Sequence, residues 1–215
     1  MRSDWVPWSA SALVIGAMSL VFGFVLNPSD PGASTGQTFG VVHEDGARWL
    51  AMAVMFVLAS MCLTLGLPAV TVLLESRGRI LGGVGLALLT FGAIGTCGYG
   101  MLLVFFRAVV VNGGLQRDKF DEVGGDFSLN LFVYGWIAAF YGGVLLVAVA
   151  LLVARTVPRW VPVTLLGFVV ALPVSGHVGR VGAAIQVLLF AVGLTGIAMT
   201  AVADTRGGYT ARTVG

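Results

Sequence analysis

The sequence predicts an all-α protein, a polytopic bundle of six transmembrane helices with both termini in the cytoplasm. Of its 215 residues, 58% are hydrophobic and only 10% are charged, against about 25% charged residues in soluble domains. Mean hydropathy is +0.97, and the apolar residues form long runs with the charged residues between them. A soluble core cannot hide this much apolar surface. The sequence therefore indicates a protein that is surrounded by the lipid bilayer.

Six apolar runs are the predicted spans. A helix that crosses a bilayer needs about 20 mostly apolar residues. Five runs reach this length, and a shorter sixth has Pro162 near its start and Pro173 near its end. We predict that the sixth run also spans; the alternative is a re-entrant segment, whose backbone must be covered by protein or water. The spans are residues 8–26, 49–74, 80–111, 129–154, 160–176 and 181–203, in one integral membrane domain of residues 1–215.

The distribution of charge predicts the orientation. With six spans, the side that holds both termini carries seven arginines and three carboxylates, and the other side carries five basic and seven acidic residues. Arg and Lys collect on the cytoplasmic side. Both termini are therefore expected inside, in a multi-pass protein of the cytoplasmic (inner) membrane with outer loops at residues 27–48 and 112–128. Trp49 and Trp160 lie at span ends, a position typical of tryptophan at the membrane interface.

The charged residues also exclude some functions. No Asp, Glu, Lys, Arg or His lies at the centre of a predicted span, whereas ion-coupled carriers, proton relays and voltage sensors normally need one there. A carrier or channel is therefore the third of three hypotheses. A net charge of +2 with one lysine, Lys119, offers no basic surface for nucleic acid. The sequence requires no cofactor, and Cys62 and Cys97 are typical of small packing residues.

Small residues recur along several spans, and in lipid such residues mark the faces where helices meet. The stripes consist of Ser9, Ala12, Gly16, Ser19 and Gly23 in the first span and of Gly135, Ala139 and Gly143 in the fourth. The same faces can pair with another copy of the chain or with a different subunit. The first hypothesis for function is therefore a non-enzymatic accessory or oligomeric membrane subunit.

The stretch VVHEDGARWL, residues 41–50, holds a His-Glu-Asp cluster. Alanine at position 47 rules out the HExxH zinc motif. The favoured interpretation is that Glu44 and Asp45 precede the second span, because carboxylates stabilise the start of a helix. The alternative is a cluster of polar residues on the outer face. In that cluster two histidines bind a metal if they converge, or two arginines hold a phosphate. Its members are His43, Glu44, Asp45, Arg107, His177 and Arg180.

His177 belongs to the stretch LPVSGHVGR, which resembles the PSGH motif of the phosphatidic acid phosphatase family. The resemblance implies a membrane enzyme with a second histidine further along the chain. Here Val174 separates Pro173 from Ser175, and no histidine follows His177. The chain is therefore assigned to no family on this motif.

Aromatic residues gather on the fourth predicted span. They are Tyr134, Trp136, Phe140 and Tyr141, with Tyr99 on the third span. Helix packing is the favoured interpretation, and the alternative is a pocket for a lipid or isoprenoid, in which Tyr and Trp supply polar atoms. The second hypothesis for function is therefore a membrane enzyme or binding protein for a lipid-like substrate, with the outer-face cluster as its head-group site. The sequence does not decide whether the protein is an enzyme.

Overall fold

The computed structural model describes residues 5–29, 33–74, 78–114 and 124–213, and the regular structure in these segments is helical. Five of these helices are long and apolar enough to cross a membrane, in agreement with the predicted class of a helical membrane bundle. They are α1 (Val6–Leu26), α3 (Gly46–Val72), α4 (Arg79–Val111), α6 (Phe127–Ala154) and α9 (Arg180–Thr213), of which the part Arg180–Thr205 forms the apolar span. Shorter helices are α2 (Thr35–Glu44), α7 (Trp160–Val170) and α8 (Leu172–Val178).

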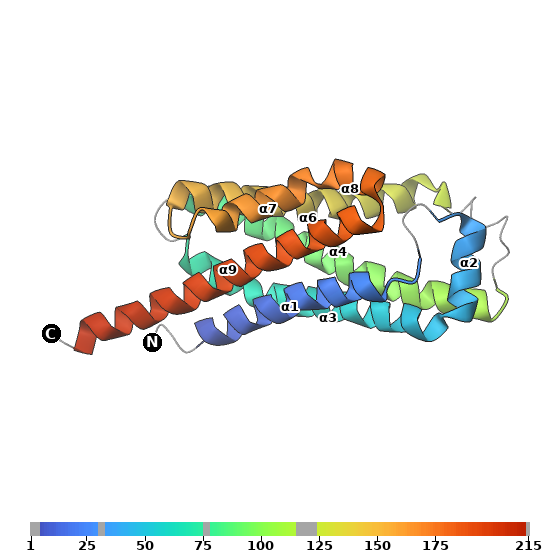
Figure 1. Ribbon diagram of the computed structural model, residues 1–215, viewed down its shortest axis with the longest axis horizontal. Helices are drawn as coiled ribbons and strands as arrows, with labels where there is room; N and C mark the ends of the chain where they lie inside the picture. The colour runs from blue at the N-terminus through green and yellow to red at the C-terminus, as the bar shows by residue number, and fades with distance from the viewer. Residues whose placement is uncertain (1–4, 30–32, 75–77, 115–123, 214–215) are drawn as a thin grey trace.

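The long helices and α7 form a closed ring. Helix α1 packs on α3, α3 on α4, α4 on α6, α6 on α7, α7 on α9, and α9 returns to α1. Successive helices run in opposite directions, so the start of α1 and the end of α9 lie at the same end of the bundle (Figure 1). The opposite end, where α2 lies, is called the α2 end from here on. It contains the end of α1 and the starts of α3, α6 and α9.

Glycines bring α4 and α6 into backbone contact. A Cβ built on Gly92 would lie 2.6 Å from the Phe140 Cα, and one built on Gly143 would lie 2.6 Å from the Leu89 backbone nitrogen. Between helices in lipid no hydrophobic force favours contact, so close packing at small residues holds them together. The small-residue stripe of the fourth predicted span thus contacts a helix of the same chain at Gly143. At Gly135 no described atom lies within 4 Å of the ideal Cβ position.

The small-residue stripe of α1 faces α3. A Cβ on Gly16 would lie 2.8 Å from the Leu63 backbone nitrogen. Ser9 is buried, and its hydroxyl donates to the backbone oxygens of Leu65 and Gly66 and accepts from the backbone N–H of Ala69 at 3.0 Å. Pro68 lies inside α3 in this region and has no N–H of its own to donate. The serine therefore supplies hydrogen bonds where the proline interrupts the helix pattern.

The predicted span over residues 160–176, which is the fifth in chain order, consists of two helices rather than one. The sequence predicts a helix over residues 160–176 that bends or ends at Pro173, but the break falls earlier, at Ala171. Pro173 instead lies in the first turn of α8, where its missing N–H costs no helical hydrogen bond. Gly179 ends α8 with φ +70°, a left-handed backbone angle that favours glycine, and α9 begins at the next residue.

Helix α2 lies in a segment that the sequence predicts to be a loop. It begins with a capping box: the Ser34 hydroxyl accepts from the Gln37 N–H, and the Gln37 side chain accepts from the Ser34 N–H at 2.8 Å. Its buried residues Phe39 and Val42 pack with Trp49 and with the last turns of α4. The 33 residues of α4 give a helix of about 50 Å, longer than the roughly 30 Å of a hydrocarbon core, and α2 covers part of that excess.

Trp49 corrects a prediction. The sequence places it at the membrane interface, but its side chain is only 5% exposed and lies in the small core beneath α2. Its indole N–H donates to the Leu103 carbonyl at 3.0 Å, which joins α3 to α4. Trp160, by contrast, is 48% exposed at the start of α7.

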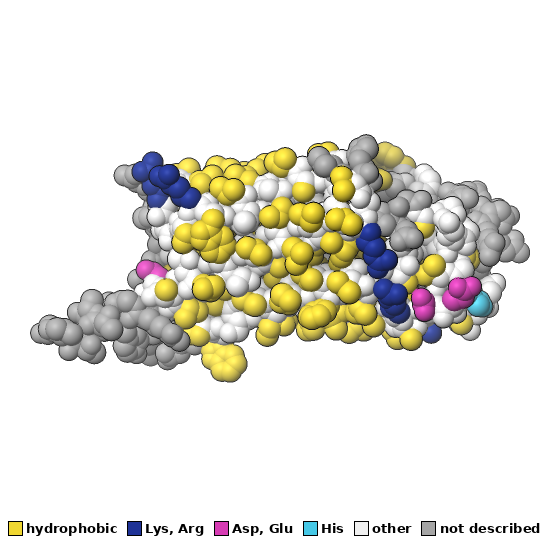
Figure 2. Space-filling view, in the orientation of Figure 1, with side chains coloured by type: hydrophobic (Ala, Val, Ile, Leu, Met, Phe, Trp, Pro, Cys, Tyr) yellow, Lys and Arg dark blue, Asp and Glu magenta, His cyan; other side chains and the backbone are white. Residues whose placement is uncertain are grey.

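Charged side chains are confined to the two ends of the visible face. Figure 2 shows a wide hydrophobic belt between a group of basic side chains at one end and basic, acidic and histidine side chains near the α2 end. Large apolar side chains point outward within the spans, among them Phe22, Leu65 and Phe91, each more than half exposed. Such an exposed belt is unfavourable in water and matches the hydrocarbon core of a bilayer in character.

The contact between α4 and α6 yields a stability prediction. We expect Gly92→Ala to destabilise the protein by about 1–3 kcal/mol, because the new methyl group overlaps the backbone of Phe140. The matched control is Gly83→Ala on the exposed face of the same helix, where no atom lies within 4 Å; it should change stability by less than about 0.5 kcal/mol. Thermal unfolding in detergent, followed by circular dichroism, measures both, and equal melting temperatures for the two variants would contradict the close contact.

Candidate functional site

Two arginines of the α2 end bind the end of α1. The Arg48 guanidinium donates to the Val25 carbonyl at 3.1 Å, and the Arg180 guanidinium donates to the Asn27 carbonyl at 2.9 Å. The last carbonyls of a helix lack intrahelical donors and lie at its negative end. These contacts therefore give the two cations a structural role, in which α3 and α9 are tied to α1. Arg48 was not among the predicted site residues.

Arg107, near the end of α4, packs against the start of α3. It is half-buried and lies against Gly46, where a Cβ would meet its Nε at 2.9 Å. The Nε itself is buried and has no hydrogen-bond partner among the residues that the structure describes. Arg107 thus lies beside the junction of α2 and α3, next to the His-Glu-Asp stretch, whereas Arg180 lies at the end of α1. The two arginines of the predicted outer-face cluster therefore have different neighbours.

The acidic members of the predicted cluster are exposed. His43 and Glu44 end α2, and Asp45 stands at the N-cap position of α3. The predicted capping role holds only in part: the Asp45 side chain makes no capping hydrogen bond, and its carbonyl accepts from the Trp49 N–H. Within the described residues no three His, Cys, Asp or Glu side chains are grouped to hold a metal. The side chain of His177, in α8, is not described, so a metal site there stays a prediction.

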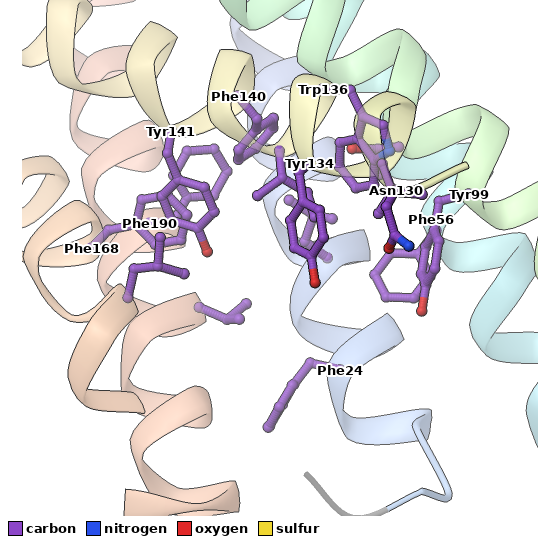
Figure 3. A pocket seen from close by; sticks show the side chains of 16 residues that line it. Phe24, Phe56, Tyr99, Asn130, Tyr134, Trp136, Phe140, Tyr141, Phe168 and Phe190 are labelled. Carbon is purple, nitrogen blue, oxygen red and sulfur yellow. The ribbon is translucent and has the colours of Figure 1, made fainter. Parts of the chain in front are cut away.

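A cavity of about 580 Å³ lies between the helices, in the half of the bundle nearer the α2 end. All five residues of the predicted apolar pocket line it, because α4 and α6 turn them toward the same space (Figure 3). They are Tyr99, Tyr134, Trp136, Phe140 and Tyr141. Other helices supply the opposite walls: Leu20, Phe24, Phe56, Phe168, Leu172, Val187 and Phe190, while Thr96, Asn130, Val133 and Ile137 complete the lining.

Aromatic rings form two groups in the cavity wall. In the first, Tyr141 stacks on Phe168 with ring centroids 4.8 Å apart and planes 8° apart, and Phe190 lies 4.7 Å from Phe168. In the second, Tyr99 lies between Phe56, at 5.8 Å, and Trp136, at 6.1 Å. Aromatic pairs in such arrangements are favourable beyond their buried area. They give the cavity walls that are both apolar and rigid.

Gln186 is another residue that the sequence analysis missed. It is 5% exposed in α9, and its amide nitrogen donates to the Tyr141 hydroxyl and to the Phe168 carbonyl, both at 3.1 Å. Phe168 lies three residues before the break between α7 and α8. The amide therefore binds backbone near the place where the regular helix stops, and it joins three helices at the cavity wall. The sequence signal that could have identified Gln186 was a polar amide side chain well inside an otherwise apolar run.

The cavity wall carries no formal charge in the part of the chain that the structure describes. Three of its polar side chains are engaged within the protein: the Thr96 hydroxyl donates to the Gly92 carbonyl, the Asn130 amide donates to the Gly124 and Asp126 carbonyls, and the Tyr141 hydroxyl accepts from Gln186. The other polar side-chain atoms are the hydroxyls of Tyr99 and Tyr134 and the Trp136 indole N–H. Such a wall suits an uncharged molecule that is mostly apolar.

Comparison with known proteins gives no relative. The sequence matches no protein-family model, and neither the curated proteins nor the solved structures include a match.

The hydrogen bonds of Gln186 yield a second stability prediction. We expect Gln186→Leu to destabilise the protein by about 1–3 kcal/mol, because the buried Phe168 carbonyl loses its side-chain donor. Tyr141→Phe is the matched control: it removes one acceptor but leaves the bond from Gln186 to Phe168, and its cost should be smaller, about 0.5–1.5 kcal/mol. Thermal unfolding in one detergent ranks the two variants. A Gln186→Leu protein as stable as the wild type would show that this bond contributes nothing.

Proposed function

We propose that this chain is an integral membrane protein that holds one lipid-like molecule in the cavity between its helices. The observation that carries the proposal is the cavity itself, about 580 Å³ in volume and lined by uncharged, largely aromatic side chains. Cavities of about 300–1,000 Å³ with apolar walls and a few polar groups are typical of sites for small molecules. An uncharged site inside a membrane bundle is most easily reached by a molecule that already dissolves in the bilayer.

The broken helix α7–α8 supports a binding role for this space. Phe168 near the end of α7 and Leu172 at the start of α8 both line the cavity, so the break lies in its wall. Irregular backbone at membrane depth is tolerated only where protein or a cavity surrounds it, and discontinuous helices mark the binding sites of many membrane proteins. The break between α7 and α8 thus lies beside the space that a bound molecule would occupy.

The rim gives a route to the cavity. Tyr134 lines the space, yet its side chain is 67% exposed, whereas Phe140, two turns further along α6, is 7% exposed. The wall therefore runs from the surface of the bundle to its interior. A molecule that enters beside Tyr134 would place its apolar part against the deeper aromatic group.

An oligomeric or accessory role remains the second candidate, and one observation favours it. Glycines on α4 and α6 have no atom within 4 Å of their ideal Cβ positions: Gly83, Gly98, Gly135 and Gly142. Most other glycines of these two spans are covered by a neighbouring helix of the same chain. Uncovered small residues allow another helix to approach closely.

For topology we propose six spans, with α7 and α8 together as the fifth, and both termini in the cytoplasm. The charge rule supports this orientation: among described residues, the end opposite α2 carries Arg79, Arg155 and Arg159 against Asp204, while basic and acidic residues balance at the α2 end. The test is cysteine labelling in intact cells with a membrane-impermeant maleimide. We expect Ser34→Cys to react in intact cells and Arg155→Cys to react only after the cells are opened. The reverse pattern would show that the protein has the opposite orientation in the membrane.

The binding proposal is tested by filling the cavity. We expect the wild-type protein, purified in a mild detergent, to carry a bound lipid that native mass spectrometry detects and chromatography identifies. Val187→Trp should lose at least about nine-tenths of it, because the indole occupies the space that Val187 lines. Val192→Trp is the control, on the outward face of the same helix where Val192 is 47% exposed. Equal lipid content in both variants would place the lipid elsewhere.

A further inference from the structure

The hydrogen bonds at the inner end of the cavity fix the direction of one donor. The Gln186 amide nitrogen lies 3.1 Å from the Phe168 carbonyl oxygen and 3.1 Å from the Tyr141 hydroxyl oxygen. A backbone carbonyl can only accept a hydrogen bond. The atom beside it must therefore be the amide nitrogen rather than the amide oxygen, which settles the orientation of the Gln186 side chain.

The orientation of Gln186 determines what Tyr141 can do. An amide nitrogen donates and does not accept, so the Tyr141 oxygen accepts from it. The hydroxyl proton of Tyr141 is then available for another partner. Within the described residues this proton has no acceptor, and in Figure 3 the hydroxyl points into the space enclosed by the labelled side chains.

The surroundings of this proton restrict the atom that can meet it. Phe140, Phe168 and Phe190 lie around Tyr141 and contribute only apolar side chains. A carboxylate would bring an uncompensated charge into this environment. A group that can only donate offers no acceptor to this proton. The group that fits is a neutral oxygen that accepts this hydrogen bond, and a carbonyl oxygen does so without adding a donor that needs its own partner in apolar surroundings.

We propose, resting on the function proposed above, that the bound lipid carries a neutral carbonyl oxygen that accepts a hydrogen bond from Tyr141. Gln186 is a positioning residue, because it acts on the ligand only through the Tyr141 hydroxyl. The apolar body of the ligand lies along the aromatic wall toward Tyr134 at the rim. Two kinds of membrane lipid share this chemistry, the isoprenoid quinones and the acyl esters of glycerol.

The experiment compares three probes in the purified full-length protein: decyl-benzoquinone, dioctanoylglycerol and hexadecane. Each is titrated at a fixed detergent concentration, and the dissociation constant is taken from the rise in melting temperature. We expect Tyr141→Phe to weaken the preferred carbonyl probe about fivefold, the effect of one neutral hydrogen bond, and to leave hexadecane unchanged. The probe that loses affinity identifies the ligand as a quinone or an ester.

Controls separate this inference from the proposed function. Thr195→Val removes a hydroxyl from α9 at a position that does not line the cavity and should change binding of the carbonyl probes by less than about twofold. Unchanged affinity of both carbonyl probes in Tyr141→Phe overturns the carbonyl assignment, while cavity binding itself would stand on the hexadecane result. If no probe raises the melting temperature of the wild-type protein and no lipid co-purifies, both proposals are wrong.

Discussion

Backbone contact between helices at glycine is the interaction on which the rest of this bundle depends. In lipid the apolar surfaces of two helices gain nothing from leaving water, so association relies on dispersion and on hydrogen bonds across the contact. Gly92 and Gly143 let α4 and α6 touch along their middle turns, and Gly16 does the same for α1 and α3. Side chains then need only fill the remaining gaps, and at one end of the ring they leave a cavity.

The cavity lies beside close helix contacts that continue toward the α2 end. Helix α4 stays on α3, since Gly100 lies against Val57 and the Trp49 indole binds the Leu103 carbonyl. It also stays on α6, since Gly95 lies against the Trp136 ring. The opposite wall comes from α1, α7 and α9, and aromatic side chains line much of the space.

The sequence was informative wherever a single property decides the structure. Hydropathy placed the five long helices because membrane thickness sets their length. The residues Tyr134 and Tyr141 could be assigned to one face of α6 because a spacing of seven residues brings them there, and both line the cavity. That a ligand occupies this space stays a prediction.

The features that the sequence did not predict depend on contacts between distant segments. Helix α2 has a local signal in its Ser34–Gln37 capping box, yet its apolar residues are few and gain a core only from α3 and α4. The break at Ala171 and the hydrogen bonds of Gln186 are linked across α7 and α9, which no local pattern reveals. Arg48 and Arg180 bind backbone carbonyls at the end of α1, and these contacts could not be predicted because a backbone acceptor carries no mark in the sequence.

The closed ring has a consequence for biogenesis. Helix α1 is made before α9, although α9 is one of its two neighbours in the ring and Arg180 at the start of α9 binds the end of α1. During synthesis the α9-facing side of α1 therefore stays uncovered by α9 until that helix is made. The cavity, whose walls include Val187 and Phe190 of α9, is complete only once α9 is in place, when the ring closes.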